Sequence, residues 1–211
     1  MNPEILTQID SKGYQTKPEK KEFAFIRSRF RRNVATVISL NQLEKAIETG
    51  HTIYPVKAKG IRATDWEGQN LFIIDIDNDR EGKMLTEEET IGICKKYNIK
   101  PIMIYQTYSH TPKYPKLRVL FLCEELITDE QKRKTIIETL IRLFPQADTA
   151  CKNADRMFLG TNKKVCYRDE TAVFTFDDII RINGELPQVI KTEDKITGSK
   201  KYNNKDRKSV V

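Results

Sequence analysis

The segment LFIIDID at residues 71–77 constrains the fold of this chain more than any other. Four consecutive apolar residues followed by a turn cluster are typical of a strand that is buried on both faces. Side chains two positions apart on a strand point to the same face, with Cα atoms roughly 6.6 Å apart. Asp75 and Asp77 are therefore expected to present two carboxylates on one face, at the end of a buried strand.

Helices and strands alternate after this strand. The order β-α-β-β-α-β over residues 71–176 predicts an α+β fold whose mixed or antiparallel sheet is of the ferredoxin-like or RNA-recognition-motif (RRM-like) type. Caps are expected at Thr86, Thr128 and Asp177, at the starts of three helices. The expected strands after residue 77 are 102–106, 117–123, 155–160, 165–168 and 172–176.

A smaller α/β module is expected ahead of this core, over residues 19–70. It would contain a helix at 19–32, a strand at 34–39, a short helix that begins after Ser39, and an extended segment at 51–58. Residues 1–18 are expected to be an N-terminal arm. Residues 186–211 are polar, basic and without apolar periodicity, which predicts a disordered tail or linker.

The positive charge is concentrated near the two ends of the chain. Residues 12–32 carry +6, residues 191–211 carry +4, and residues 33–190 carry only −1. Basic segments around a balanced core are typical of proteins that bind nucleic-acid phosphates, although a solvated helix and a solubilising tail would give the same counts.

Composition excludes several classes of protein. No apolar run approaches the ~20 residues that span a bilayer, and the N-terminus lacks the basic and apolar regions of a signal peptide. The four cysteines form no CxxC pair, so neither a zinc ribbon nor a dithiol redox site is indicated. We therefore expect a soluble cytoplasmic protein that does not contact a membrane.

The paired carboxylates suggest a metal site. Asp75 and Asp77 would repel each other if nothing positive lay between them, and two Mg²⁺ or Mn²⁺ ions roughly 3.5–4 Å apart would fit. A third carboxylate could come from Asp148 or from Asp155. Alternatively, the apolar strand simply runs into an acidic turn, and the later aspartates cap turns.

The loop before residue 117 suggests a phosphate site. Ser109 and His110 precede Lys113, Lys116 and Arg118. A hydroxyl, an imidazole and several cations in one loop and strand would suit the oxygens of a triphosphate. The alternative is an ordinary surface histidine.

Three motifs in this order, FIIDIDN, SHTPKYPKLRVLF and QADTACKNADRMFLGT, resemble the catalytic core of the archaeo-eukaryotic primase superfamily. The chain is most similar to the primase-polymerase domains of phage and plasmid replication proteins, over roughly residues 20–185. The family's motifs match Asp75 and Asp77, then Ser109 and His110, then Asp148. Here Ser109 and His110 are adjacent, whereas the family pattern places one residue between them.

The resemblance implies that residues 19–185 form a DNA primase or polymerase domain, with its RRM-like catalytic core at 71–180. It implies template-directed nucleotidyl transfer with two Mg²⁺ or Mn²⁺ ions held by Asp75, Asp77 and Asp148. The nucleotide would be bound by Ser109, His110, Lys116, Arg118 and Arg156. The implied partners are a single-stranded DNA template, an NTP or dNTP, and a replicative helicase of a phage, plasmid or other mobile element.

Other classes of function remain open from the residues alone. A phosphatase of the haloacid-dehalogenase type also uses two aspartates after a strand, but Asp79 stands where that motif has Thr or Val. A non-catalytic RRM-like module would bind single-stranded nucleic acid through exposed aromatic pairs on its central strands. A relaxase-type initiator would need paired histidines, and His51 and His110 are not paired in the sequence.

Overall fold

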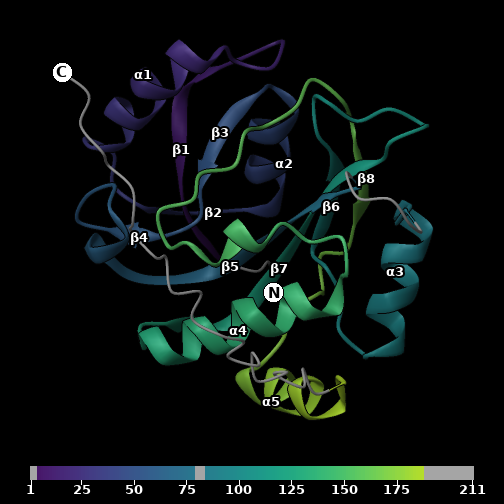
Figure 1. The fold of residues 1–211 in the computed structure, drawn as a ribbon. Helices are drawn as coiled ribbons and strands as arrows, with labels where there is room; N and C mark the ends of the chain where they lie inside the picture. The colour runs from purple at the N-terminus through teal and green to yellow at the C-terminus, as the bar shows by residue number, and fades with distance from the viewer. Residues whose placement is uncertain (1–3, 79–83, 188–211) are drawn as a thin grey trace, which may run out of the picture.

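The computed structural model describes residues 4–78 and 84–187. Helices and strands follow one another through this part of the chain as two antiparallel sheets with helices packed around them (Figure 1). The strands are β1 (Ile5–Gly13), β2 (Thr36–Ile38), β3 (His51–Tyr54), β4 (Lys57–Ala58), β5 (Trp66–Asp77), β6 (Met103–Gln106), β7 (Lys116–Ile127) and β8 (Val165–Arg168). The helices are α1 (Lys20–Phe30), α2 (Leu40–Glu48), α3 (Glu87–Lys96), α4 (Glu130–Leu143) and α5 (Phe176–Glu185), with two 3₁₀ turns, η1 (Ala63–Asp65) and η2 (Thr149–Lys152).

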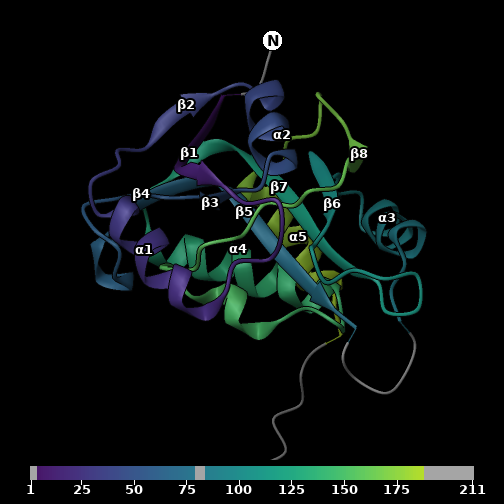
Figure 2. The ribbon, with the colours of Figure 1, turned by 90° about the horizontal axis from the view of Figure 1, so that it is seen from above.

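The larger sheet has the strand order β4-β5-β7-β6-β8, and all its neighbouring strands are antiparallel. The α+β class and the antiparallel sheet expected from the sequence are confirmed. The middle parts of the central strands, residues 71–74 of β5 and 119–123 of β7, are apolar and buried, as the run at 71–74 predicted for β5. Figures 1 and 2 show α4 packed along one side of these strands, with α5 outside it.

The smaller sheet has the order β2-β1-β3. Its central strand β1 lies within residues 1–18, where the sequence predicted an arm and no strand. No apolar alternation marks this strand in the sequence, because three of its buried side chains, Thr7, Gln8 and Asp10, are polar. Thr7 and Gln8 donate hydrogen bonds to the carbonyls of Tyr54 and Val56, and Asp10 has a charged partner described below.

The two sheets share one hydrophobic core. Its main cluster joins Ile5, Leu43 and Ile53 from the N-terminal half to the strands β5, β6 and β7. Asn70 on β5 also links the sheets, because its amide accepts from the Leu6 N–H and donates to the Glu4 carbonyl. A second, smaller cluster, Ile26, Phe30, Tyr54, Val56 and Ile61, lies beneath α1. The N-terminal half is therefore packed against the strands that carry the aspartates.

Local signals in the sequence place some elements correctly and misplace others. Capping boxes begin α2 at Ser39 and α3 at Thr86, as predicted. Asp129, not Thr128, caps α4, because its side chain accepts the Lys132 N–H. Thr175, not Asp177, caps α5, because its side chain accepts the Asp178 N–H. Of the three short strands expected near the C-terminus, only 165–168 forms one; Phe158 and Phe174 each make a single bridge instead.

The tail predicted at 186–211 lies almost wholly outside the described residues, and so does Asp79. Within the described part of the chain, no helix is both long and apolar enough to cross a bilayer.

Candidate active site

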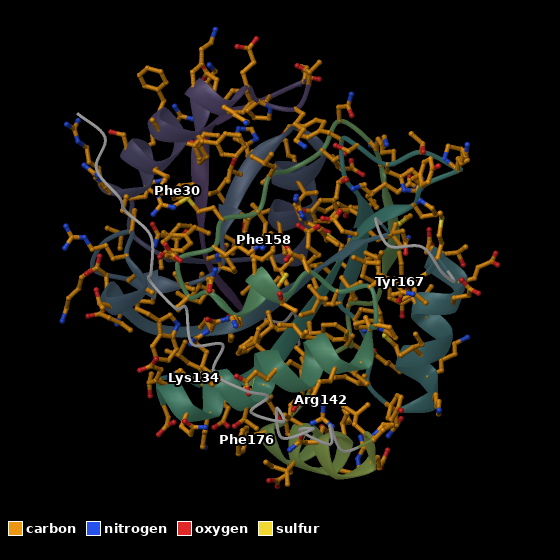
Figure 3. The ribbon with its side chains drawn as sticks, viewed as in Figure 1. Phe30, Lys134, Arg142, Phe158, Tyr167 and Phe176 are labelled. Carbon is orange, nitrogen blue, oxygen red and sulfur yellow. The ribbon has the colours of Figure 1, made fainter. Side chains whose placement is uncertain are left out.

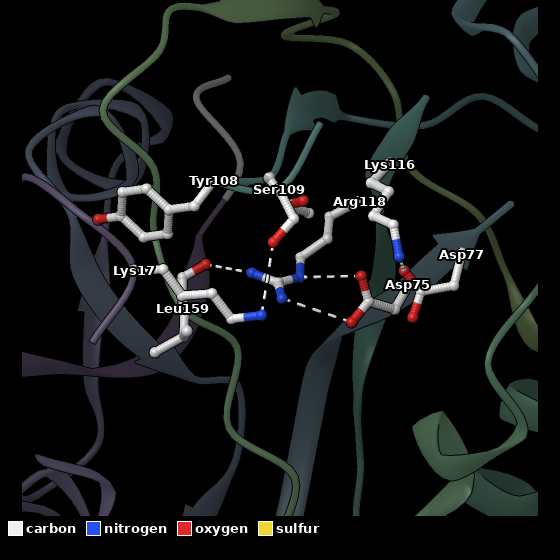
Figure 4. Close-up of a pocket in the computed structure, with 9 residues that line it drawn as sticks. Lys17, Asp75, Asp77, Tyr108, Ser109, Lys116, Arg118 and Leu159 are labelled. Atoms are coloured by element: carbon white, nitrogen blue, oxygen red, sulfur yellow. Dashed lines mark hydrogen bonds and ion pairs between the residues drawn. The ribbon is translucent and has the colours of Figure 1, made fainter. Parts of the chain in front are cut away.

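The register between β5 and β7 creates the centre of the site. Antiparallel pairing sets Asp75 directly opposite Arg118 and Asp77 directly opposite Lys116. Opposite residues of an antiparallel pair have side chains close together, so each carboxylate meets a cation. The Arg118 Nε lies 3.2 Å from the Asp75 Oδ1, and the Lys116 Nζ lies 3.1 Å from the Asp77 Oδ1 (Figure 4).

Asp75 is a buried carboxylate between two guanidinium groups. Its side chain is 8% exposed, and Arg156 donates to its Oδ2 at 2.9 Å while Arg118 donates to its Oδ1. Arg118 also donates to the Tyr105 hydroxyl and the Leu159 carbonyl. Burial disfavours the guanidinium charge, but Asp75 and Tyr105 together outweigh the effect of burial and raise the pKa of Arg118. The site therefore fixes two positive charges around one negative charge in a region largely closed to water.

The ring of Phe158 lies against both guanidinium groups. The ring centroid is 5.7 Å from the Arg118 Cζ and 5.4 Å from the Arg156 Cζ, within the range of a cation–π contact. Phe158 is buried near the middle of the molecule, where it bridges to Ile53 on β3 (Figure 3). This aromatic platform holds both arginines toward Asp75.

Of the two later aspartates, Asp148 lies beside Asp75 and Asp155 does not. The Asp148 N–H donates to the Asp75 carbonyl at 2.8 Å, and its Oδ2 lies 2.7 Å from the same Arg156 nitrogen that contacts Asp75. Although burial opposes it, hydrogen bonds from the Ala150 N–H and from Arg156 lower the pKa of Asp148. Asp155 instead pairs with Arg27 of α1 at 3.4 Å.

An open cavity of about 310 Å³ lies over these charges. It is lined by Lys17, Asp75, Asp77, Thr107, Tyr108, Ser109, Lys116, Arg118 and Leu159 (Figure 4). Lys17 is exposed and donates to the Ser109 hydroxyl at 3.4 Å, so the loop before β7 meets the segment before α1. The cavity, called the acid–base cavity below, thus combines two carboxylates with three cations and three hydroxyl side chains.

The sequence did not single out Lys17, Thr107 or Tyr108. Lys17 belongs to the basic segment 12–32, but nothing in that segment showed that this one lysine would reach the distant loop. The Tyr108 hydroxyl donates to the Tyr14 carbonyl, and burial raises its pKa to about 12. Tyr108 therefore remains protonated and anchors the loop to the N-terminal half.

His110 lies beside the acid–base cavity and is not among the residues that line it. Its Nδ1 accepts a hydrogen bond from the Lys116 N–H at 3.1 Å, and its carbonyl accepts one from the Lys163 Nζ at 3.0 Å. Burial, and then the charge of Lys163, lower the pKa of His110. A neutral imidazole that accepts at Nδ1 carries its proton on Nε2.

A comparison with solved structures shows a protein whose fold is similar to that of this chain. The archaeo-eukaryotic primase (AEP) domain of the cyanophage S-2L primase-polymerase is similar to this chain with a TM-score of 0.51. The two are 11% identical in sequence, and the match covers 86% of this chain and 89% of that one. The fold resembles a phage primase-polymerase domain. No family model and no curated protein sequence matches the chain.

The primase-like fold raises the question of a metal. Within residues 4–78 and 84–187, no three His, Cys, Asp or Glu side chains form a ready-made metal centre. However, Asp75 and Asp148 both contact one Arg156 nitrogen, so their carboxylates converge on a single point, and Asp77 is 37% exposed beside them. Mg²⁺ commonly takes only one or two protein carboxylates and completes its shell with substrate phosphates and water. The chemistry of these carboxylate donors therefore fits a hard divalent cation.

Proposed function

We propose that this chain is a nucleotidyltransferase that makes or extends DNA primers on a single-stranded template. The observation that carries the proposal is the acid–base cavity, where Asp75 and Asp77 lie beside Lys17, Lys116 and Arg118. A reaction that joins nucleotides needs carboxylates for divalent ions and cations for the triphosphate in one place. The similarity of fold to a phage primase-polymerase domain supports the same assignment.

In this proposal, Asp75, Asp77 and Asp148 hold Mg²⁺ or Mn²⁺, as two ions when a nucleotide is bound. The ions would lower the pKa of the attacking 3′-hydroxyl and stabilise charge on the α-phosphate and the leaving pyrophosphate. Arg156 would then leave the carboxylate oxygens it contacts now and turn toward a phosphate of the nucleotide.

Lys17, Ser109, Lys116 and Arg118 are assigned to the triphosphate. Cations and a hydroxyl that are already held in place can stabilise the developing negative charge without reorganising. His110 acts chiefly by fixing the backbone of Lys116, and its Nε2–H is the group available for a phosphate oxygen. The partners we propose are single-stranded DNA, an NTP or dNTP, and a replicative helicase of a mobile element.

Primer extension on a gel tests the proposal. The full chain is incubated with a primed single-stranded template, Mg²⁺ or Mn²⁺ and labelled nucleotides. We expect extension by wild type that stops when the divalent ions are chelated. Asp77→Ala should reduce it by about 100-fold or more, since metal stabilisation of the transition state is worth several kcal/mol.

Glu67→Ala is the matched control. Glu67 is an acid on the same strand, but it pairs with Lys57 and Lys59 away from the cavity, so extension should be unchanged. Full activity in Asp77→Ala, or no synthesis by wild type with either ion, would contradict the proposal.

A non-catalytic single-strand-binding module is the second candidate, and α1 favours it. Phe23 and Phe25 are exposed on this basic helix, at 39% and 59%, and exposed aromatics beside cations stack nucleic-acid bases. This candidate predicts binding of single-stranded DNA without any nucleotide incorporation, and the same assay therefore separates the two.

A further inference from the structure

A second cavity, of about 450 Å³, adjoins the acid–base cavity. The two share Arg118 and Leu159 as a common wall, so the Arg118 guanidinium lies between them. The second cavity opens between α1 and the segment that follows η2. We call it the α1 cavity. Its size is typical of pockets that take a small organic ligand.

The lining of the α1 cavity differs from that of its neighbour. Apolar side chains form much of its wall: Phe23 and Ile26 from α1, and Met157 and Leu159 from the segment opposite. The acid–base cavity has one apolar side chain, Leu159, among its lining residues. Charged side chains, Arg27, Arg118, Asp155 and Arg156, form another part of the α1 cavity's wall, so this cavity suits a group with a flat apolar face and polar edges. The acid–base cavity suits charged phosphates.

A buried hydroxyl in the α1 cavity lacks a partner. Thr52 on β3 lines the cavity and is 1% exposed, and its Oγ1 has no hydrogen-bond partner among the described residues. A buried polar atom without a partner costs free energy, so an unsatisfied hydroxyl in a cavity wall indicates a ligand or water that binds there. The Asn153 amide on the opposite wall adds a group that can both donate and accept.

We propose that the α1 cavity binds the nucleoside part, base and sugar, of the nucleotide whose phosphates lie in the acid–base cavity. Phe23 would stack on the base, and Thr52 and Asn153 would hydrogen-bond to the sugar. The proposal rests on the proposed function, because it assumes that the acid–base cavity takes a triphosphate. Stacking on an aromatic ring tolerates all four bases, as a polymerase requires.

Binding measurements with two ligands test it. The full chain with Mg²⁺ is titrated by calorimetry with ATP or dATP, and separately with inorganic tripolyphosphate, which has the phosphates but no nucleoside. Phe23→Ala should weaken nucleotide binding by about ten-fold, the loss of one base–aromatic stack, and leave tripolyphosphate binding unchanged. Phe23→Leu, which keeps the apolar wall but loses the aromatic ring, should weaken nucleotide binding in the same direction.

Two further variants make the test specific. Phe25→Ala removes the same ring two residues along α1, outside the cavity lining, and should change neither affinity. Lys17→Ala removes a cation of the acid–base cavity and should weaken both ligands by a similar factor. Thermal melts confirm that each variant is folded.

The outcomes separate the two proposals. Nucleotide affinity that is unchanged in both Phe23 variants overturns the nucleoside pocket, and so does an equal loss for nucleotide and tripolyphosphate. If wild type binds neither ligand, the triphosphate site of the proposed function is overturned, and the nucleoside pocket with it.

Discussion

At the scale of single residues, Asp75 and Asp77 are two positions apart but have different surroundings. Asp75→Ala would leave the buried Arg118 guanidinium without a carboxylate and Arg156 with Asp148 alone, and we expect the free energy of unfolding to fall by about 3–5 kcal/mol. Asp77→Ala breaks a partly exposed pair with Lys116 and should cost about 1 kcal/mol or less. Urea denaturation of both variants measures the difference. Equal losses would contradict this view of Asp75.

This difference decides which variant can report on chemistry. Loss of synthesis in Asp75→Ala could follow from unfolding alone, because Asp75 is buried between two guanidinium groups. Asp77→Ala is therefore the variant chosen for the activity test.

His110 should make the protein less stable in mild acid. Its pKa in the folded protein is below the ordinary value of 6.5, so the unfolded chain binds a proton more readily. The contribution of His110 to stability is thus complete above pH 6.5 and is lost as the pH falls toward the lowered pKa. Urea denaturation at about pH 7.5 and about pH 5 should show a larger loss for wild type than for His110→Ala. The same loss in both proteins would contradict the prediction.

At the scale of elements, α1 is held in place by an internal ion pair. Arg29 donates to both oxygens of Asp10 on β1, at 2.5 and 2.6 Å, and the Asp10 side chain is fully buried. These hydrogen bonds raise the pKa of Arg29. Arg29 of the basic segment 12–32 therefore stabilises the fold, and only the other cations of this segment are available to bind phosphates.

Breaking this pair should release α1. Arg29→Ala leaves a buried carboxylate unpaired and should lower the free energy of unfolding by about 3–5 kcal/mol, with faster proteolysis at α1. The double variant Arg29→Leu with Asp10→Leu removes both charges and should be less destabilised than the sum of the single variants. Strict additivity, measured by denaturation, would show that the two side chains do not act as a pair.

At the scale of the whole molecule, the segment at residues 191–211 is polar and basic and lacks the apolar periodicity of a segment that joins a hydrophobic core. Deletion of residues 191–211 should therefore leave the melting temperature unchanged. It also removes a charge of +4, so affinity for single-stranded DNA should fall, most visibly at low salt. A large drop in melting temperature would show that the tail belongs to the fold.

The sequence by itself determined the features that depend on neighbouring residues. The apolar run at 71–74 predicted a buried strand, and the capping boxes at Ser39 and Thr86 predicted the starts of two helices. These predictions succeed because apolar patterning and helix capping each depend on residues only a few positions apart. It did not find β1, whose buried Thr7, Gln8 and Asp10 take partners far along the chain. Likewise, local patterns left β8 unplaced in the sheet, where it pairs with β6.

Motifs in the sequence named several residues of the candidate site, and tertiary structure decided how these residues are arranged. Asp75, Ser109 and Arg118 could be named from motifs, since each motif is local. Only the β5–β7 register sets Arg118 against Asp75, and only the fold brings Asp148, rather than Asp155, to the same guanidinium. Lys17 reaches Ser109 across 92 positions of sequence. Such contacts depend on strand register and on the packing of distant segments, which no short window of sequence contains.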